Sequence, residues 1–344
     1  MPTKGIEKNR NFCQNRQLSF AKKLCILYGG GAFTYSLRWV RKYRKVIRSG
    51  QLPDRNFLFL FGGVVLAGDL HCHTKMSDGS VGIEELISMA KRRNMCAIAV
   101  TDHDTVAGAT RAVIIGRRQG IQVIHGVEFS AFSKQHGLKS HILCYDCKKP
   151  DRLEGLCRKI GESRRAASLE QLRMVMRYYP IPQELVTRCA TGSTNLFRQH
   201  IMHALMEAGY ASEMYGEVYQ RLFNTKTGIA YRKMEWYPEP QEVIDLIHSA
   251  GGLAVLAHPY VYHNDQILEE LTAQGLDGVE AWHSRQTEEQ SAALEQYAKE
   301  HNLLVTAGTD FHGSYQSNPQ PIGTPHVTDE MVQAILTRKR AVEV

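Results

Sequence analysis

From about residue 65 onward, short apolar runs alternate with segments whose apolar residues recur at helical spacing. Between the runs, GIEELISMAKRRN places Leu86, Ile87 and Ala90 on one face, and AGATRAVIIGRRQG ends at Gly120. Repeated strand–helix units of this kind predict parallel strands, in a βα barrel or a doubly wound sheet. The predicted strands lie in VVLAGDLH, CAIAV, IQVIHGVEFS, KSHILCY, LAVLAH, LDGVEAW and LLVTAGTDFH.

The alternation stops between residues 148 and 237. The segments LEGLCRKIGESRRAASLEQLRMVMRYY and TNLFRQHIMHALMEAG are predicted helices, with no strand between them. We therefore expect a helical subdomain at 148–237, inserted between barrel segments at 65–147 and 238–344. His200 and His203, in the second helical segment, are expected to be structural or to face a substrate.

The first 64 residues form a basic leader that differs from the rest of the chain. Residues 1–67 hold 13 Lys and Arg against Glu7 and Asp54, a net charge of +11, which leaves −4 for the remainder. The segment FTYSLRWVRKYRKVIR has the composition of a basic amphipathic helix that touches membrane or RNA. We favour a leader that is disordered or non-native, the product of an over-extended gene model. The acidic main body lacks the broad basic field of proteins that bind long nucleic acids.

Cysteine usage and hydropathy indicate the cellular setting. Eight scattered cysteines suggest a reducing compartment, and no segment reaches the roughly 18–20 apolar residues that span a bilayer. Cys144 and Cys147 form a CxxC pair without the second pair of a zinc knuckle; a redox role and two unrelated thiols both remain open. We expect a cytoplasmic protein without firm membrane association.

Residues of the types that bind metals follow nearly every predicted strand. The carboxyl ends of the strands in a βα barrel share one face, so these residues are expected to gather there. His71 and His73 point to the same side of their strand, because side chains alternate with period two. The other candidates are Asp78, Asp102, His103, Asp104, Glu128, His141, His258, Asp310 and His312.

Each candidate also has an ordinary explanation by itself. Asp104 or Thr105 can cap a helix, His258 can be a core histidine, and Glu128 can cap a helix or pair with a base. Together, so many buried carboxylates and imidazoles would be costly without a cation. Mixed His, Asp and Glu ligands suit Mn, Fe or Zn, and closely spaced ions are well suited to phosphate ester hydrolysis.

The motifs DLHCHTKMSDG, AVTDHDT, GVEFS, HIL, AHP and GTDFH, in this order, resemble those of the polymerase and histidinol phosphatase (PHP) superfamily. The resemblance covers residues 65–325 and implies an α/β fold: a distorted (βα)7 TIM-like barrel that holds two or three divalent ions, manganese before iron or zinc. The insert, with TNLFRQHI and TKTGIAY, is similar to a narrower branch. Those bacterial phosphoesterases act on 3′,5′-nucleoside bisphosphates and trim short RNA from its 5′ end.

The resemblance implies nine metal ligands in three groups. They are His71, His73, Glu128 and Asp310 for one ion, Glu128 again with His141 and His258 for a second, and Asp78, His103 and His312 for a third. All nine positions hold the expected residue types, which favours a working enzyme. Asp102 is expected to orient neighbouring ligands.

The expected substrate is a small nucleotide phosphate ester or a short 5′-phosphorylated oligoribonucleotide, attacked by a hydroxide that bridges two ions. Arg198 matches a phosphate-gripping arginine of the branch, against the alternative of an ordinary surface arginine. Lys226 and Arg232 are weaker candidates for a second phosphate, because NTKTGIAYRK departs from the glycine-rich pattern of the branch. Either His258 or a metal-bound water is expected to protonate the leaving group.

Three alternatives stay open. A phosphatase of another metabolite, such as histidinol phosphate, is disfavoured by the large insert. A nuclease that acts on long nucleic acid is disfavoured by the acidic body. A metal-binding module without turnover is disfavoured by the complete ligand set. The sequence does not indicate an oligomeric state.

Overall fold

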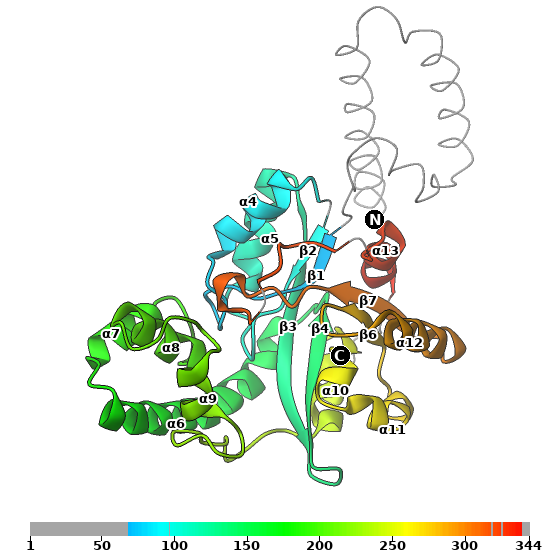
Figure 1. Ribbon diagram of the computed structural model, residues 1–344. Helices are drawn as coiled ribbons and strands as arrows, with labels where there is room; N and C mark the ends of the chain where they lie inside the picture. The colour runs from blue at the N-terminus through cyan, green and yellow to red at the C-terminus, as the bar shows by residue number, and fades with distance from the viewer. Residues whose placement is uncertain (1–67, 96, 318, 325, 339–344) are drawn as a thin grey trace, which may run out of the picture. The chain divides into compact units, whose positions relative to one another are not determined.

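One curved sheet organises the computed structural model, which describes residues 68–338 except 96, 318 and 325 (Figure 1). The basic leader lies outside the described residues. Seven strands of the described part follow one another in the sheet in chain order. They are β1 (Gly68–Cys72), β2 (Ala97–Val100), β3 (Gln122–Ser133), β4 (Leu138–Tyr145), β5 (Leu253–Leu256), β6 (Gly278–His283) and β7 (Leu304–Gly308).

The sheet curves until its first and last strands meet. A parallel bridge joins Cys72 at the end of β1 to Phe311, just beyond β7. Asp69 in β1 strengthens this closure, because its carboxylate accepts hydrogen bonds from the Thr309 backbone N–H at 3.0 Å and from the Gly323 N–H at 2.8 Å. The predicted distorted, seven-stranded barrel is therefore confirmed.

The strand directions correct one expectation. β4 runs antiparallel to both β3 and β5, whereas the other neighbouring pairs are parallel. Only residues 134–137 connect β3 to β4, and Gly137 takes a positive φ of 69° in this turn. A helical crossover between parallel strands needs about a dozen residues or more, so this short connection can only make a hairpin.

Helices and short turns pack around the barrel and at its end. They are α4 (Ile83–Arg92), α5 (Ala109–Gln119), α10 (Pro240–Ser249), α11 (Leu268–Ala273), α12 (Glu288–Glu300) and α13 (Asp329–Thr337), with short 3-10 turns η1 (Pro150–Leu153), η2 (Pro259–Val261), η3 (Asn264–Ile267) and η4 (Gly313–Tyr315). The predicted apolar face of α4 is confirmed, because Leu86, Ile87 and Ala90 are buried against β2 residues such as Ile98.

An apolar plug fills the barrel interior. It includes Leu70, Leu143 and Val255 from three strands, together with Val332 and Ile335 of α13. α13 packs near Gly68 at the start of β1, since Val327 lies beside that glycine. The polar strand ends therefore face the opposite end of the barrel.

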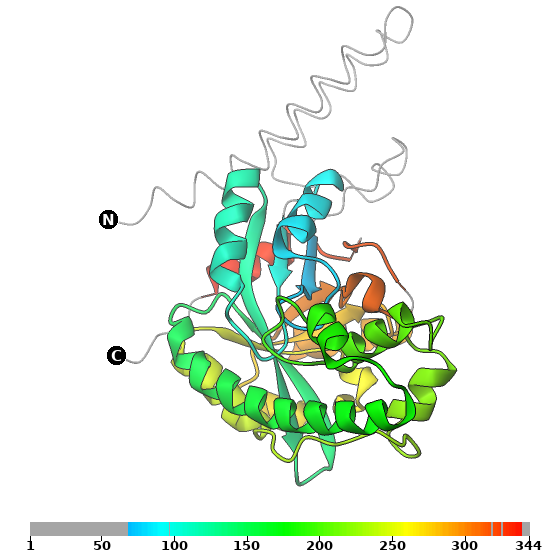
Figure 2. The same ribbon diagram turned by 90° about the vertical axis from the view of Figure 1, so that its left-hand side faces the viewer.

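Four helices lie between β4 and α10: α6 (Glu154–Tyr178), α7 (Gln183–Cys189), α8 (Arg198–Glu207) and α9 (Glu217–Phe223). Figures 1 and 2 show them, in green, together beside one end of the barrel. They bury a core of their own, which includes Val175, Val186, Ile201, Leu205 and Leu222. Of the helices that the structure describes, none combines the length and the apolar character of a membrane crossing.

The apolar plug generates a stability prediction. Leu143→Ala leaves a cavity among fully buried neighbours, so we expect the free energy of unfolding to fall by about 2–5 kcal/mol. Ile114→Ala is the control, because this α5 side chain is 45% exposed and its truncation should change stability by less than about 0.5 kcal/mol. Urea denaturation measures both, and equal effects would contradict the assignment of the core.

Candidate metal centre

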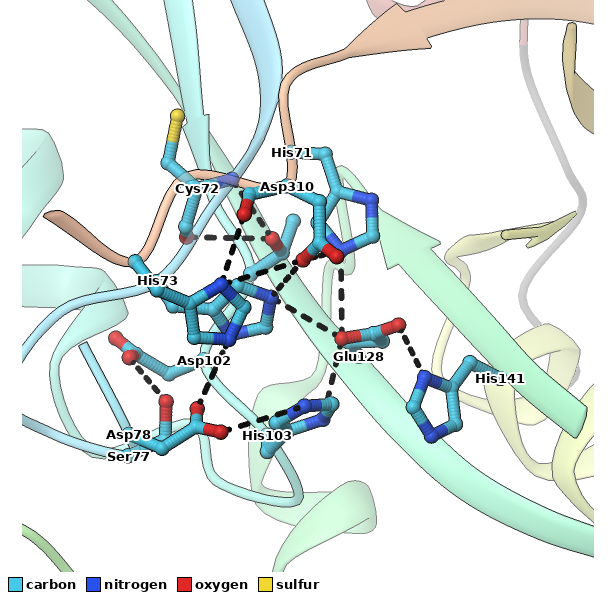
Figure 3. Close-up of polar contacts among 12 residues, drawn as sticks. His71, Cys72, His73, Ser77, Asp78, Asp102, His103, Glu128, His141 and Asp310 are labelled. Carbon is cyan, nitrogen blue, oxygen red and sulfur yellow. Dashed lines mark hydrogen bonds and ion pairs between the residues drawn. The ribbon is translucent and has the colours of Figure 1, made fainter. Parts of the chain in front are cut away.

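The nine predicted ligands come from separate strands and loops and meet at the barrel end opposite α13. Figure 3 shows those nearest Glu128, among them His71 and His141. Their side chains are buried or nearly so, with His71, His73 and Glu128 completely shielded from solvent. His71 lies 3.5 Å from Asp310 and Asp78 lies 3.3 Å from His312, although more than 230 residues separate the members of each pair in the sequence. The structure thus brings these residues together, as the sequence analysis expected.

Two of the nine reach the cluster differently from the expectation. Glu128 lies inside the long strand β3, and His141 lies in the first half of β4, so neither follows the end of its strand. The antiparallel register pairs Ser130 with His141, and alternation places Glu128 on the same face of the hairpin. His141 therefore reaches the site because β4 runs in reverse and begins at the end where β1, β2 and β7 finish.

Glu128 is the centre of the cluster. Its two carboxylate oxygens point in different directions and each faces its own set of imidazoles. The nitrogens lie 3.3 Å (His71), 3.1 Å (His73) and 3.1 Å (His103) from Oε2, and 2.6 Å (His141) and 3.0 Å (His258) from Oε1. A carboxylate in this position is able to contribute one oxygen to each of two neighbouring ions.

The first group has the spacing that a metal ion requires. The Nε2 atoms of His71 and His73 each lie within 3.1–3.5 Å of Glu128 Oε2 and of Asp310 Oδ1. Metal–ligand bonds of 2.0–2.2 Å place neighbouring ligand atoms roughly 3.0–3.6 Å apart. The four side chains therefore fit around one ion without rearrangement.

Further groups share members with the first. Ligand atoms within 4.8 Å of one another occur in the set His73, Asp78, His103 and His312 and in the set His103, Glu128 and His141. His258 joins the latter region, since its Nε2 is 3.3 Å from His141 Nδ1. The described residues thus contain several clusters that are able to bind metal ions.

Buried polar atoms without hydrogen bonds provide a second test of whether these residues suit a metal ion. Each buried polar atom that lacks a hydrogen bond costs about 1–3 kcal/mol. Among the described residues, such atoms concentrate in this cluster: His71 Nε2, His73 Nδ1 and Nε2, Asp78 Oδ1, His103 Nδ1, Glu128 Oε2, His141 Nε2 and His258 Nδ1. Divalent cations satisfy lone pairs of these kinds, so the residues present suit a metal centre.

Electrostatics keep the acidic ligands ionised. Burial by itself raises the pKa of the Glu128 carboxyl, but the surrounding imidazoles, His141 first, outweigh it and hold that pKa well below its usual value. The same competition, with His312 as the main neighbour, lowers the pKa of Asp310. For His73, burial favours the neutral ring, but the carboxylates of Asp310 and Glu128 prevail and raise its pKa to about 10. The centre therefore attracts positive charge.

Glu280 on β6 is a supporting residue that the sequence analysis missed. Its carboxylate lies 3.0 Å from His71 Nδ1 and accepts a hydrogen bond from the His258 backbone N–H at 2.9 Å. An acid bound to one ring nitrogen fixes the orientation of the other toward a metal. His283, at the end of the same strand, lies 3.5 Å from Asp310. The signal available in the sequence was an acid inside the otherwise apolar run LDGVEAW, followed by a histidine.

Asp102 holds the loop that carries the ligands. Its carboxylate accepts hydrogen bonds from the Thr74 backbone N–H at 2.7 Å and the Thr74 hydroxyl at 2.8 Å. It also accepts one from the Ser77 hydroxyl at 2.7 Å (Figure 3). Thr74 and Ser77 lie between the ligands His73 and Asp78. Asp102 thus fixes the loop from which these two side chains project, and its role in orienting metal ligands stays a prediction.

A cavity of about 400 Å³ lies beside the cluster. One wall consists of the metal-binding side chains, and the other comes from the inserted helices. The insert contributes cationic and aromatic side chains, including Arg164, Phe197, Arg198, Tyr219, Tyr231 and Arg232. Lys226 is exposed and is not among the residues that line this cavity.

Two arginines of this wall are held in place. The Arg198 guanidinium lies over the Tyr231 ring, 4.9 Å from its centroid, and its Nε donates to Gln171 Oε1 at 3.3 Å. Arg164, which the sequence analysis did not single out, forms an ion pair with Asp104. Both guanidinium groups therefore enter the cavity with little freedom to move away.

Removal of one ligand tests the metal centre. His71→Ala should lower the amount of tightly bound divalent metal by at least one ion per chain, because His71 belongs to the group with the most regular spacing. It should also reduce the rise in melting temperature on metal addition, since metal at 100 times its Kd stabilises a protein by about 2.7 kcal/mol. Metal analysis and thermal denaturation measure these effects, with the exposed His301→Ala as control. Undiminished metal content in His71→Ala would contradict the assignment.

Comparisons with known proteins agree with this geometry. The PHP domain model matches residues 69–309. The chain is 37% identical over 253 residues to the phosphoribosyl 1,2-cyclic phosphate 1,2-diphosphodiesterase of Eggerthella lenta, covering 73% of this chain and 96% of that protein. It is 33% identical over 268 residues to the 5′-3′ exoribonuclease Rnm of Escherichia coli, covering 76% and 88% respectively.

A solved structure adds to the sequence comparisons. A protein from Bifidobacterium adolescentis, described as a metal-dependent phosphoesterase, superposes with a TM-score of 0.70 at 28% identity, over 78% of this chain and 94% of that one. The named relatives are hydrolases of phosphoester bonds, which confirms the predicted reaction class and the resemblance drawn from the motifs. The chain belongs to the PHP domain family.

Proposed function

We propose that this protein is a metal-dependent phosphoesterase that hydrolyses a phosphate ester of a small nucleotide. The observation that carries the proposal is the cavity, in which a metal-binding wall faces a wall of arginine and aromatic side chains. Arginine binds phosphate, and aromatic rings stack on bases. A cavity of about 400 Å³ lies in the lower part of the usual range for small-ligand sites, about 300–1,000 Å³, which favours a single nucleotide unit over a long polymer.

The nine ligands are proposed to hold two or three divalent ions in the three groups that the family resemblance implies, with manganese preferred over iron and zinc. Donors that combine imidazole and carboxylate without thiolate support this choice. Bound ions would supply Lewis acidity toward the phosphoryl oxygens and a nucleophile at neutral pH. The two outward-facing oxygens of Glu128 support a shared ligand between neighbouring ions.

The protein's own side chains are proposed to position the ester. Arg198 holds a phosphate through its planar guanidinium, which Tyr231 and Gln171 orient. Arg232 lines the same wall and is the better candidate for a second phosphate than Lys226, because Lys226 is exposed away from the cavity. His258 is proposed to act mainly as a ligand, since its Nε2 faces Glu128 Oε1 at 3.0 Å.

Residues 148–237 are proposed to serve as the substrate cover between barrel segments 65–147 and 238–344. The Thr194 backbone N–H donates to the Met76 carbonyl at 3.0 Å, and the Gln199 side chain donates to Asp78 Oδ2 at 3.0 Å. These bonds tie the insert to the loop that carries Asp78. We also propose a reducing, cytoplasmic setting, which is supported by the free thiols of all five cysteines that the structure describes.

A second candidate substrate is a cyclic phosphodiester of a pentose. The support is the 37% identity to the Eggerthella lenta phosphodiesterase, together with the coverage of 96% of that protein. The same metal-binding wall serves either substrate, so the choice depends on what the arginine and aromatic wall accepts. We rank the nucleotide ester first because the aromatic residues Tyr219 and Tyr231 line the cavity.

A substrate panel tests the proposed function. Manganese-loaded protein is assayed with a 3′,5′-nucleoside bisphosphate, a short 5′-phosphorylated oligoribonucleotide, a pentose 1,2-cyclic phosphate and histidinol phosphate. We expect kcat/KM for one of the nucleotide substrates to exceed that for histidinol phosphate by at least tenfold, because only the former can use base stacking. Preference for the cyclic sugar phosphate would establish the second candidate. The absence of hydrolysis across the panel would instead favour a non-catalytic module.

Arg198 allows a sharper test of phosphate binding. Arg198→Ala should lower kcat/KM by about 10- to 100-fold, because charge-assisted hydrogen bonds contribute about 1.5–3 kcal/mol. Arg198→Lys should restore only part of the loss, since an ammonium lacks the planar fork. The control is Arg173→Ala on α6, where the side chain is exposed and paired with Glu170. Unchanged steady-state kinetics in Arg198→Ala would make this residue an ordinary surface arginine.

A further inference from the structure

Three potential metal ligands converge in the inserted helices, and none of them belongs to the nine described above. Cys189 ends α7, while His203 and Glu207 lie one turn apart on α8. One ligand atom from each of the three lies within 4.8 Å of the other two. The sequence analysis expected His203 to be structural or substrate-facing, because the partner helix that supplies the thiol could not be known from spacing alone.

Two members of this triad, the imidazole and the carboxylate, are spaced nearly as they would be around a bound zinc ion. His203 Nε2 lies 3.2 Å from Glu207 Oε1. Tetrahedral zinc with bonds of 2.0–2.3 Å separates its ligand atoms by roughly 3.3–3.7 Å, so the imidazole and carboxylate already sit near the required distance. Residues four apart on a helix share one face, which lets α8 provide two ligands while α7 provides the third.

Neighbouring groups orient the triad. His203 Nδ1 lies 2.6 Å from the Tyr315 hydroxyl, so the hydrogen-bonding capacity of Nδ1 is used there and Nε2 is the nitrogen left facing Glu207. The second oxygen of Glu207 is held by Arg188. Hydrogen bonds to the far side of an imidazole and to the second oxygen of a carboxylate are the usual supports of metal ligands.

We propose that Cys189, His203 and Glu207 form a zinc site with solvent in the fourth position. Thiolate ligation selects Zn²⁺ over Mn²⁺, which distinguishes this site from the imidazole and carboxylate centre. The site fastens α7 to α8 and, through His203, to Tyr315. Because Tyr315 lines the catalytic cavity, bound zinc stiffens one of its walls.

Cobalt provides the spectroscopic test. Full-length protein is freed of metal with a chelator and titrated with Co²⁺, which gives a thiolate-to-cobalt charge-transfer band only where a cysteine is a ligand. We expect one such site per chain in the wild-type protein. Cys189→Ser should abolish the band, and metal analysis after Zn²⁺ loading should show one zinc fewer per chain. His203→Gln should produce the same loss through a different ligand.

Two matched controls separate a metal site from an ordinary surface ion pair. Cys157→Ser removes another half-buried thiol, on α6, and should keep the band. Arg188→Gln breaks the ion pair with Glu207 but leaves all three ligands, so it too should keep the band. Absence of the band from the wild-type protein, or an undiminished band and zinc content in both Cys189→Ser and His203→Gln, overturns the proposal. These readouts are independent of phosphoester hydrolysis.

Discussion

The burial of imidazole and carboxylate groups around Glu128 is the constraint on which the rest of this structure depends. Glu128 is fully shielded from solvent and is surrounded by five imidazoles, several of whose buried ring nitrogens make no hydrogen bond with the described residues. A polar cluster of this kind is tolerable only where cations satisfy it and a rigid frame holds it. The buried cluster therefore needs both bound cations and the closed barrel that holds its side chains in place.

Three buried carboxylates outside the set of nine ligands hold the ligands and the barrel in place. Asp69 joins the first strand to the segment after the last one, and Asp102 holds the loop between His73 and Asp78. Glu280 fixes His71 from behind and also binds the backbone of His258. Burial raises the pKa of both Asp69 and Asp102, which shows the electrostatic cost of these supports. Hydrogen bonds from backbone and hydroxyl groups offset it.

The inserted segment completes the cavity beside the metal-binding side chains. The barrel supplies the metal-binding side chains that line one side of this cavity. Arg198 and Tyr231 come from the insert and complete the cavity on its other side. The insert has its own apolar core and its own candidate ligands for zinc, and hydrogen bonds such as that from Gln199 to Asp78 join it to the barrel.

The sequence alone was sufficient for the strands, the helical faces and a list of candidate ligands, because short apolar runs and residue types are local properties of the chain. The reduction of that list to nine came from the resemblance of the motifs to a known family. It did not reveal that β4 runs in reverse, which depends on the hairpin after Ser133 and decides how His141 reaches Glu128. It also missed Glu280 and the approach of Cys189 to His203. These contacts join elements that are distant in the chain or turned toward each other by packing, and no local pattern records which side chains meet. Only the tertiary structure decided them.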